Sequence, residues 1–498
     1  MKAKKLLAVL MTSAMLFGTA LPTFAAGRPQ ASDATIVTVS EVETGATVTA
    51  YQIANAVYNS NGFVKYESEY VKNVAEPTSN EIADVAAKIN NGTLNSLKSV
   101  VMLDDDNNGV YENKLNPGLW VVLVRGTHGA KIYNPMLVSV AYSVSGSDAT
   151  MTPGNINANT DWTLETNNAW AKTSDVALTK EAKDTADFGE AVAYTITATV
   201  PAYGPEYTDP TFMIKDTLAN GDLKLTNGTI TVKVGDVVVP TDNYTVTGNA
   251  ADSTEFTVVF NSKWVKENGN KDVVITYDAT VTSNKVNTES HDNTVVLTYS
   301  DNPGTTTTVE DTEKVYSFDV GGKATGDIFK KTEANGTTAL ANAEFTLYTD
   351  ADCNEKYVNE VHLADQPTAT TNDSGNIYIT GLDIGTYYLK ESKAPDGYTL
   401  NDTVYKIEVN ATVESEELKT WTIKIKDMSN NKETTHTFTV NGDQVQSEGG
   451  ETTVIKNTKL SSLPSTGGIG TTIFTIGGCV IMVAAAGLYF STRKKEEN

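Results

Sequence analysis

Three polar residues near the C-terminal end of the chain are predicted to lie on strand faces that are otherwise apolar. Lys331, Glu391 and Asn457 each alternate with aromatic or aliphatic residues, and alternate residues of a strand share a face. An amine, an acid and an amide buried together must satisfy one another. Burial favours the neutral amine and the protonated acid, and a neutral amine is a nucleophile. The alternative is a buried Lys331–Glu391 ion pair with a hydrogen-bonded Asn457. Lys330 competes as the lysine, but it lies on the opposite strand face.

A second set of the same kind occurs in the middle of the chain. Lys180, Asp216 and Asn293 also alternate with apolar residues in sequences typical of strands. We expect these side chains to meet in the same way, with aspartate as the acid. The alternative is that they are exposed residues at strand ends, and Asn302 is the rival amide.

The two ends of the chain read as processing signals. Lys2, Lys4 and Lys5 precede an apolar run that ends near Leu21. This order is typical of a secretory signal peptide, which we predict over residues 1–26. The small residues Ala25 and Ala26 mark the cleavage site.

The C-terminal end, residues 461–498, combines three features. The motif Leu463-Pro464-Ser465-Thr466-Gly467 precedes an apolar stretch, residues 469–490, and a basic tail, residues 493–495. An apolar helix of about 22 residues can span a bilayer, and the basic tail favours a cytoplasmic end. The arrangement resembles the sorting signal of sortase substrates. That resemblance implies attack by a sortase thiolate on the carbonyl of Thr466, with release of Gly467 and formation of an acyl-enzyme.

Strand-forming segments dominate the sequence between the two signals. They alternate apolar and polar residues and are separated by Gly, Asn, Asp and Pro turns, which predicts antiparallel β-sandwiches. One helix is expected over residues 78–91, with Ser79 as a possible cap. We predict an all-β chain of three tandem immunoglobulin-like sandwich domains: 27–172, 173–320 and 321–460.

The third domain resembles the collagen-adhesin B-type domains of Gram-positive pilins. The segment Gly385-Thr-Tyr-Tyr-Leu-Lys-Glu-Ser-Lys-Ala-Pro-Asp-Gly-Tyr398 is similar to their E-box, and Val454-Ile-Lys-Asn-Thr-Lys459 to their last strand. The resemblance implies a spontaneous isopeptide bond between Lys331 and Asn457, assisted by Glu391. The middle domain is similar to the corresponding pilin domain, which implies a Lys180–Asn293 bond assisted by Asp216.

The first domain is expected to lack such a bond. Its segment Asn116 to Val124 echoes the E-box strand, but Val124 stands where the acid would be. In backbone pilins a lysine at the end of this domain attacks the acyl-enzyme of the next subunit. By that resemblance Lys172 is the polymerising residue, although the surrounding Ala171 and Thr173 depart from the family motif. Lys131 is the rival lysine.

The charge of the chain excludes some classes of function. The net charge is −24. It becomes −28 after removal of residues 1–26, which carry three lysines, and of everything after Thr466, which carries three basic and two acidic residues. Such a surface repels nucleic acids. The four histidines show no metal-ligand spacing. Asp104 to Gly109 resembles half of a calcium loop, but a tight turn is expected there because the twelfth position is Leu115, with weak calcium binding as the alternative. We expect no metal, no cofactor and no enzymatic turnover of substrates.

These features together indicate a major pilin, the shaft subunit of a covalent pilus on the surface of a Gram-positive cell. Its expected partners are pilin-type and housekeeping sortases, further copies of itself, minor pilins and peptidoglycan, with an unknown host ligand. A monomeric wall-anchored adhesin and a tip or minor pilin are the alternatives.

Overall fold

The computed structural model describes residues 27–125, 131–144 and 156–493, apart from residues 220, 227, 284, 323–324, 359–368, 443 and 461–468. The predicted signal peptide with Ala25 and Ala26, and the motif Leu463 to Gly467, lie outside the described residues. The chain divides into two compact units. One contains residues 1–317 and 414–417, and the other contains residues 318–413 and 418–498.

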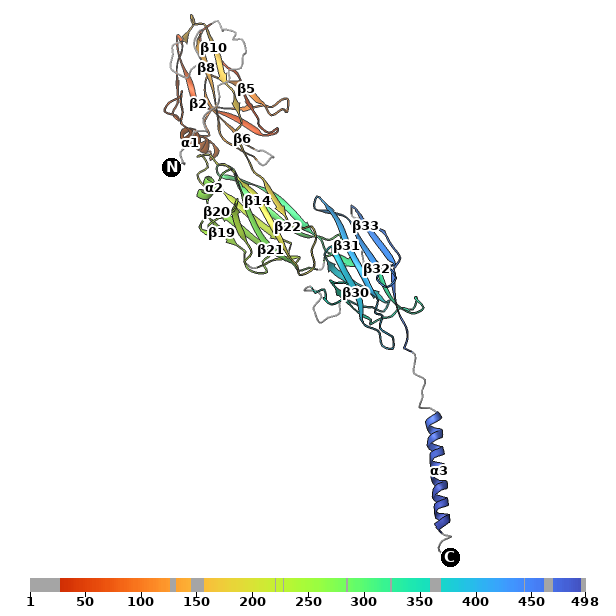
Figure 1. Ribbon diagram of the computed structural model, residues 1–498. Helices are drawn as coiled ribbons and strands as arrows, with labels where there is room; N and C mark the ends of the chain where they lie inside the picture. Colours follow the sequence, from red (N-terminus) through yellow and green to blue (C-terminus); the bar gives the residue numbers. More distant parts are fainter. Residues whose placement is uncertain are drawn as a thin grey trace. The chain divides into compact units, whose positions relative to one another are not determined.

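The first unit begins with two sheets formed by residues 35–170, which we call the first region (Figure 1). The larger sheet has the order β10-β8-β6-β2-β3-β9, with β4 against β2. The smaller sheet has the order β11-β1-β5. Their bounds are β1 Thr35–Ser40, β2 Thr47–Asn59, β3 Gly62–Glu67, β4 Ser99–Met102, β5 Tyr111–Leu115, β6 Gly118–Arg125, β8 Met136–Val144, β9 Ile156–Asn157, β10 Trp162–Asn167 and β11 Ala169–Trp170.

Helix α1 (Ser79–Asn90) covers part of this layer with its apolar face. The expectation that Ser79 caps it is wrong, because Thr78 is the N-cap. The Thr78 hydroxyl accepts from the backbone N–H of Glu81, and the Glu81 carboxylate accepts from the Thr78 N–H at 2.9 Å. This reciprocal capping box satisfies two N–H groups that the helix leaves unpaired, which places the start of the helix at Ser79.

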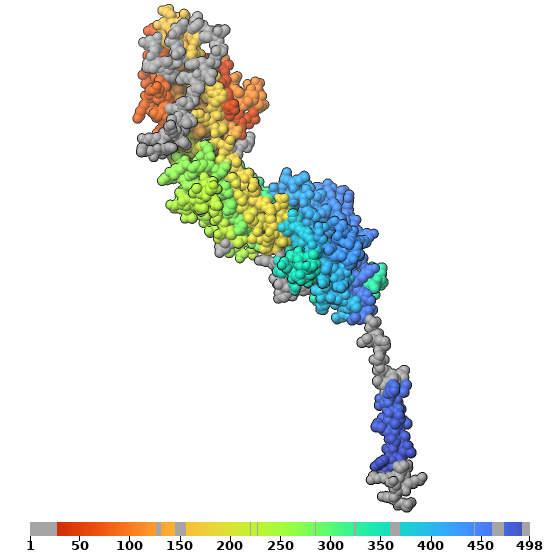
Figure 2. All heavy atoms as spheres, viewed as in Figure 1, coloured from red at the N-terminus to blue at the C-terminus, as the bar shows by residue number. Residues whose placement is uncertain are grey.

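The middle region of the first unit packs two antiparallel sheets around one apolar core. The atoms of this region are drawn mainly in yellow and green in Figure 2. One sheet has the order β13-β14-β21-β17-β18, with β16 against β21, and the other has the order β19-β20-β15-β22-β23. The bounds are β13 Leu178–Glu181, β14 Ala191–Val200, β15 Phe212–Leu218, β16 Leu223–Leu225, β17 Thr231–Val234, β18 Val237–Val238, β19 Tyr244–Thr247, β20 Glu255–Phe260, β21 Lys271–Val281, β22 His291–Asn302 and β23 Thr305–Val315.

Short elements complete the first unit. The 3₁₀ turn η1 (Thr241–Asn243) and helix α2 (Ser262–Glu267) interrupt the strands of the middle region. Strands β7 (Lys131–Tyr133) and β12 (Thr173–Asp175) pair antiparallel, and Ile132 belongs to the core of the middle region. The domain boundary predicted after residue 172 therefore falls inside one compact unit. It lies between the first region and the middle region, which this strand pairing joins.

The second unit is again built from sheets (Figure 1). The largest has the order β27-β26-β30-β31-β32-β33-β34, and smaller sheets have the orders β28-β25-β35 and β24-β29. The bounds are β24 Phe318–Val320, β25 Phe329–Glu333, β26 Glu344–Tyr348, β27 Ala369–Thr370, β28 Asn376–Ile377, β29 Ile379–Leu382, β30 Gly385–Lys393, β31 Val404–Glu414, β32 Glu417–Asp427, β33 Glu433–Asn441, β34 Gln444–Glu448 and β35 Thr453–Asn457.

The expectation of purely antiparallel sandwiches is wrong at two places. Strand β25 pairs with β35 in parallel, with Lys331 opposite Ile455, and β1 pairs with β11 in parallel. Each pair joins an early strand of its region to a late one. Because no hairpin connects such strands, the turn chemistry that fixes antiparallel pairing between neighbours does not apply to them.

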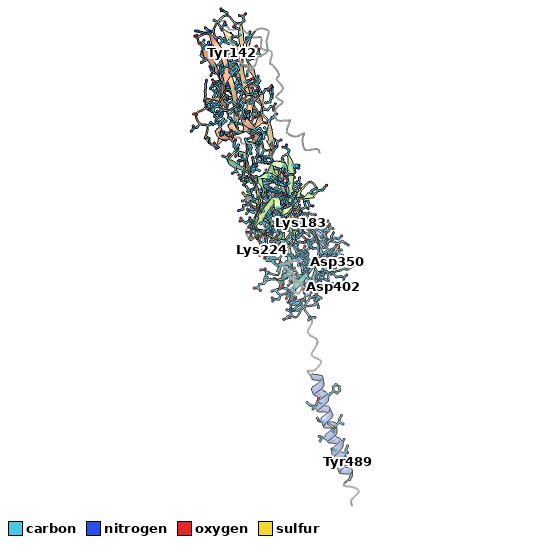
Figure 3. The ribbon with its side chains drawn as sticks, turned by 90° about the vertical axis from the view of Figure 1, so that its left-hand side faces the viewer. Tyr142, Lys183, Lys224, Asp350, Asp402 and Tyr489 are labelled. Atoms are coloured by element: carbon cyan, nitrogen blue, oxygen red, sulfur yellow. The ribbon has the colours of Figure 1, made fainter. Side chains whose placement is uncertain are left out.

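Helix α3 (Ile469–Arg493) follows the sorting motif. Its segment Ile473–Phe490 is long and apolar enough to cross a membrane. The apolar side chains of this segment are exposed, and Figure 3 shows Tyr489 projecting from the helix. An apolar helix without a protein core around it is expected for a membrane span.

Candidate functional site

The second unit brings Lys331, Glu391 and Asn457 together. Lys331 lies on β25, Asn457 on the neighbouring strand β35 and Glu391 on β30 of the larger sheet. The Lys331 ammonium donates to the Asn457 side-chain oxygen and lies 3.1 Å from Glu391 Oε1. Asn457 Nδ2 donates to the same Glu391 oxygen at 2.9 Å. The three groups therefore form a closed triangle of polar contacts.

Solvent is excluded from this triangle. Lys331 is 0% exposed, and Glu391 and Asn457 are each 2% exposed. The Phe345 ring centroid lies 5.7 Å from the lysine nitrogen, and the second Glu391 oxygen accepts from the backbone N–H of Asn401 at 2.7 Å. Burial lowers the pKa of Lys331, and the nearby Glu391 opposes that shift only in part. The amine is thereby biased toward its neutral, nucleophilic form.

The middle region assembles Lys180, Asp216 and Asn293 through a fourth residue, Tyr277. The Lys180 ammonium donates to Asp216 Oδ2 and to the Tyr277 hydroxyl at 2.8 Å. The hydroxyl in turn donates to Asp216 Oδ1 at 2.9 Å. Asn293 Nδ2 donates to the Tyr277 oxygen at 2.7 Å. The tyrosine oxygen is thus the point at which the amine, the acid and the amide converge.

Burial also sets the electrostatics of this second cluster. Lys180 is 4% exposed, Tyr277 is 2% exposed, and Asp216 and Asn293 are fully buried. Desolvation lowers the pKa of Lys180 and raises the pKa of Asp216, although the two groups attract each other. Desolvation also holds the pKa of Tyr277 well above its ordinary value. The neutral forms of all three groups are therefore favoured over the isolated charges.

Sequence reasoning missed Tyr277. Its strand, β21, buries every second residue from Val273 to Val281, and Tyr277 occupies one of these inward positions. The available signal was a phenol on an otherwise aliphatic face, because a buried hydroxyl requires a partner. The rival residues are placed differently from the predicted ones: Lys330 and Asn302 are half-buried.

Asn293 does not lie on the last strand of the middle region. It lies on β22, and β23, the hairpin partner of β22, follows it. Buried and half-buried residues alternate along β22 from His291 to Tyr299, and the Thr-rich segment Thr305–Val315 forms a further strand. A threonine run has high β propensity, but most of this strand lacks the alternation of buried apolar residues that predicts a core strand.

Lys172 lies exposed between β11 and β12. Its carbonyl accepts from the backbone N–H of Asn134 at 3.1 Å. The residue lines a cleft of about 140 Å³. The wall of this cleft is formed by Ser79, Ile82, Ala83, Pro135, Met136, Leu137, Asn167, Asn168, Ala169, Trp170, Pro205 and Glu206. The rival Lys131 is half-buried on β7, in register with Asp175, and is not part of this lining.

Glu206 adds an acid to the cleft. Its side chain is 5% exposed, and burial raises the pKa of its carboxyl group. Among the described residues, no group hydrogen-bonds its Oε1 atom. The cleft therefore places an exposed amine and a buried carboxyl group on a wall that is otherwise mostly apolar.

Two further predictions concern the first region: Val124 stands where an acid would be, and Asp104 to Gly109 forms a tight turn. Val124 is 6% exposed and belongs to an apolar cluster with Val37, Val39 and Trp120. The Asp104 carboxylate accepts from the backbone N–H groups of Asn108 and Gly109, each at 3.0 Å. These bonds close the segment into a tight turn on its own acid.

Three segments of the chain match known families. Residues 32–173 match the T6 antigen Ig like domain, residues 328–424 match the prealbumin-like fold domain, and residues 455–498 match the LPXTG cell wall anchor motif. A curated relative, the trypsin-resistant surface T6 protein of Streptococcus pyogenes serotype M6, is 27% identical over 92% of this chain and 94% of the relative.

Solved structures have the same fold. The T6 backbone pilin of serotype M6 Streptococcus pyogenes, described as a modular three-domain structure, matches with a TM-score of 0.62 at 21% identity, over 87% of this chain and 100% of that chain. The full-length major pilin SpaD of Corynebacterium diphtheriae matches with a TM-score of 0.50 at 18% identity, over 87% and 99%. The prediction of a mostly β chain of several immunoglobulin-like domains, with an apolar helix after the anchor motif, is confirmed.

Proposed function

We propose that this chain is a sortase-assembled major pilin of the Gram-positive, LPXTG-anchored type, and that its subunits are joined from Thr466 of one copy to Lys172 of the next. It is anchored to the cell wall at the surface and serves as the shaft subunit of a covalent pilus. The observation that carries the proposed linkage is the position of Lys172, exposed at the edge of a cleft.

The joining reaction consists of two acyl transfers. A sortase thiolate attacks the Thr466 carbonyl, the Thr466–Gly467 bond breaks, and the new amine of Gly467 leaves with the C-terminal segment. The neutral amine of Lys172 then attacks the thioester, an amide forms, and the thiolate is released. The mostly apolar cleft beside Lys172 offers a surface for the leucine and proline that precede Thr466 in the acyl chain.

We further infer that Lys331 and Asn457 form an isopeptide bond, assisted by Glu391. The lysine nitrogen attacks the Asn457 Cγ, a C–N bond forms, and the bond to Nδ2 breaks. Glu391 takes a proton from the lysine and delivers one to Nδ2, which it already contacts at 2.9 Å, so ammonia leaves and the acid is regenerated. The Lys180–Asn293 pair is proposed to react in the same overall manner near Asp216.

The chain is a structural protein, and each of these bonds forms only once in each subunit. Its expected partners are minor pilins, a pilin-type sortase and a housekeeping sortase. The last subunit is attached to peptidoglycan through the Thr466 of that subunit.

A cell-wall extract tests the linkage. The wild-type chain should give a ladder of covalent multimers on a denaturing gel. Lys172→Ala and the charge-conserving Lys172→Arg should both abolish the ladder, because neither provides a primary amine, while monomer remains attached to the wall. Lys131→Ala is the matched control and should leave the ladder intact. A persistent ladder in Lys172→Ala would refute the assignment, and a wild-type chain without a ladder would favour a monomeric adhesin.

A further inference from the structure

The Tyr277 hydroxyl connects the acid and the amide of the middle cluster. It contacts Lys180 Nζ, Asp216 Oδ1 and Asn293 Nδ2 within 2.9 Å. The ring is held in place on both sides, because it stacks on Tyr194 at 5.4 Å between centroids and meets Phe256 edge to face at 4.8 Å. This hydroxyl is therefore fixed at the junction of the three reacting groups.

The two clusters differ in how their acid reaches the amide. In the second unit, Glu391 accepts directly from Asn457 Nδ2 at 2.9 Å. In the middle region, the acid is Asp216, whose side chain is shorter by one methylene group. Asn293 Nδ2 there bonds the Tyr277 oxygen, and Asp216 Oδ1 bonds the same hydroxyl from the other side. A phenol thus fills the gap that the shorter acid leaves.

We propose that Tyr277 is a catalytic residue that relays a proton from Asp216 to the leaving nitrogen of Asn293. The inference rests on the proposed Lys180–Asn293 bond and goes beyond it by assigning a second residue to the reaction. It explains why an aspartate can serve here although it does not contact the amide.

The relay uses both oxygens of the acid. Lys180 Nζ attacks the Asn293 Cγ and passes its surplus proton to Asp216 Oδ2, with which it is already hydrogen-bonded. Attack makes Asn293 Nδ2 a tetrahedral amine with a lone pair, so the Tyr277 O–H, which donates to Asp216 Oδ1 before the reaction, turns to that nitrogen. It gives Nδ2 its proton as the C–N bond breaks, and the protonated Asp216 Oδ1 returns a proton to the tyrosine oxygen. Ammonia leaves, an amide remains, and both Asp216 and Tyr277 end in their starting protonation states.

The phenol is suited to relay and not to hold a charge. Burial keeps the Tyr277 pKa well above its ordinary value, so a lasting tyrosinate is disfavoured and the two proton transfers must be coupled. A general acid placed on a leaving group contributes about 10²- to 10⁴-fold to a rate. We therefore expect loss of the hydroxyl to slow the middle bond by about that factor.

Intact-mass analysis of the full chain tests the relay, with the Lys331–Asn457 bond as an internal reference. The wild-type chain should lose two molecules of ammonia, about 34 Da in total. Sampled at the time when the wild-type chain has just completed both losses, Tyr277→Phe should have lost one, about 17 Da, and peptide mapping should show Lys180 mostly unlinked. Tyr207→Phe is the matched control. It removes a buried hydroxyl that bonds the Asp301 carbonyl at 2.9 Å in the same region, and it should retain both losses.

A rescue variant separates relay from a purely structural role. Asp216→Glu in the Tyr277→Phe background supplies an acid long enough to contact the amide directly, as Glu391 does, and should restore the second ammonia loss. A Tyr277→Phe chain that forms both bonds at the wild-type rate would overturn the relay alone. Failure of the rescue in a folded double variant would also overturn it, since a lost structural contact is not repaired by a longer acid. A wild-type chain with only the third-domain bond would overturn the proposed middle bond itself.

Discussion

Asn457 Nδ2 and Glu391 Oε1, which come from different sheets of the second unit, lie 2.9 Å apart, and both side chains are almost completely buried. The Lys331 ammonium contacts both residues. Because Lys331 and Asn457 occupy neighbouring parallel strands, β25 and β35, a bond between them would fasten an early strand of the unit to the last strand before the sorting motif.

Replacing Asn457 should remove this fastening. Lys331 and Asn457 are 126 residues apart, and loop-closure arithmetic for a cross-link of that length gives about 5 kcal/mol of stability. Asn457→Ala should therefore show no ammonia loss from this site, and it should lower the melting temperature of the second unit. Intact mass and calorimetry measure the two effects.

Two further variants sharpen that test. Lys330→Ala changes the neighbouring half-buried lysine and should leave the ammonia loss in place. Glu391→Ala should abolish it although both bond partners remain. An unchanged ammonia loss in Glu391→Ala would contradict the assigned role of this acid.

The middle region should respond to tension differently from the second unit. A Lys180–Asn293 bond leaves residues 294–317 outside the covalent loop, including strand β23. At an extended length of about 3.4 Å per residue, release of that segment lengthens the chain by at most about 8 nm. Asn293→Ala should expose the whole loop and add about 40 nm. Single-molecule force spectroscopy measures both lengths, and an extension of about 40 nm from the middle region of the wild type would contradict the lock.

The stability of the middle region should fall in mild acid because of His291. This residue is fully buried, between the hydroxyls of Ser283 and Ser317, and burial lowers its pKa to about 4. Between pH 6.5 and about 4 the unfolded chain binds a proton that the folded chain excludes. Stability is therefore complete above pH 6.5 and declines below it, by up to about 3 kcal/mol from this group.

Calorimetry across that pH range checks the effect of His291. A His291→Gln chain keeps a polar group near the serines but does not titrate, so the acid-dependent decline assigned to this residue should disappear. An equal decline in both chains would show that other groups cause it.

The capping box of α1 gives a prediction for the first region, where no covalent lock is expected. Thr78→Ala removes the hydroxyl that accepts from Glu81 and should destabilise the region by about 1 kcal/mol. Ser79→Ala, the neighbouring change within the helix, should have a smaller effect. Thermal melts of the two variants decide between the residues, and equal losses would contradict the cap assignment.

The sequence by itself determined which side chains point inward. Alternation along a strand is a local property of the backbone, so the positions of Lys331, Glu391 and Asn457 on buried faces followed from their immediate neighbours. The order of the anchor motif, apolar segment and basic tail is likewise written in consecutive residues, and it predicted the cell-wall anchor that the family match supports.

Only the tertiary structure decided which of these groups touch. Contacts across two sheets depend on pairings between strands that are distant in the chain, and no local pattern specifies them. The folded chain thus placed Tyr277 between Asp216 and Asn293, set β25 parallel to β35, and put Lys172 and Glu206 in one cleft. Their chemistry arises from distance and burial, which the chain acquires only when its sheets close on each other.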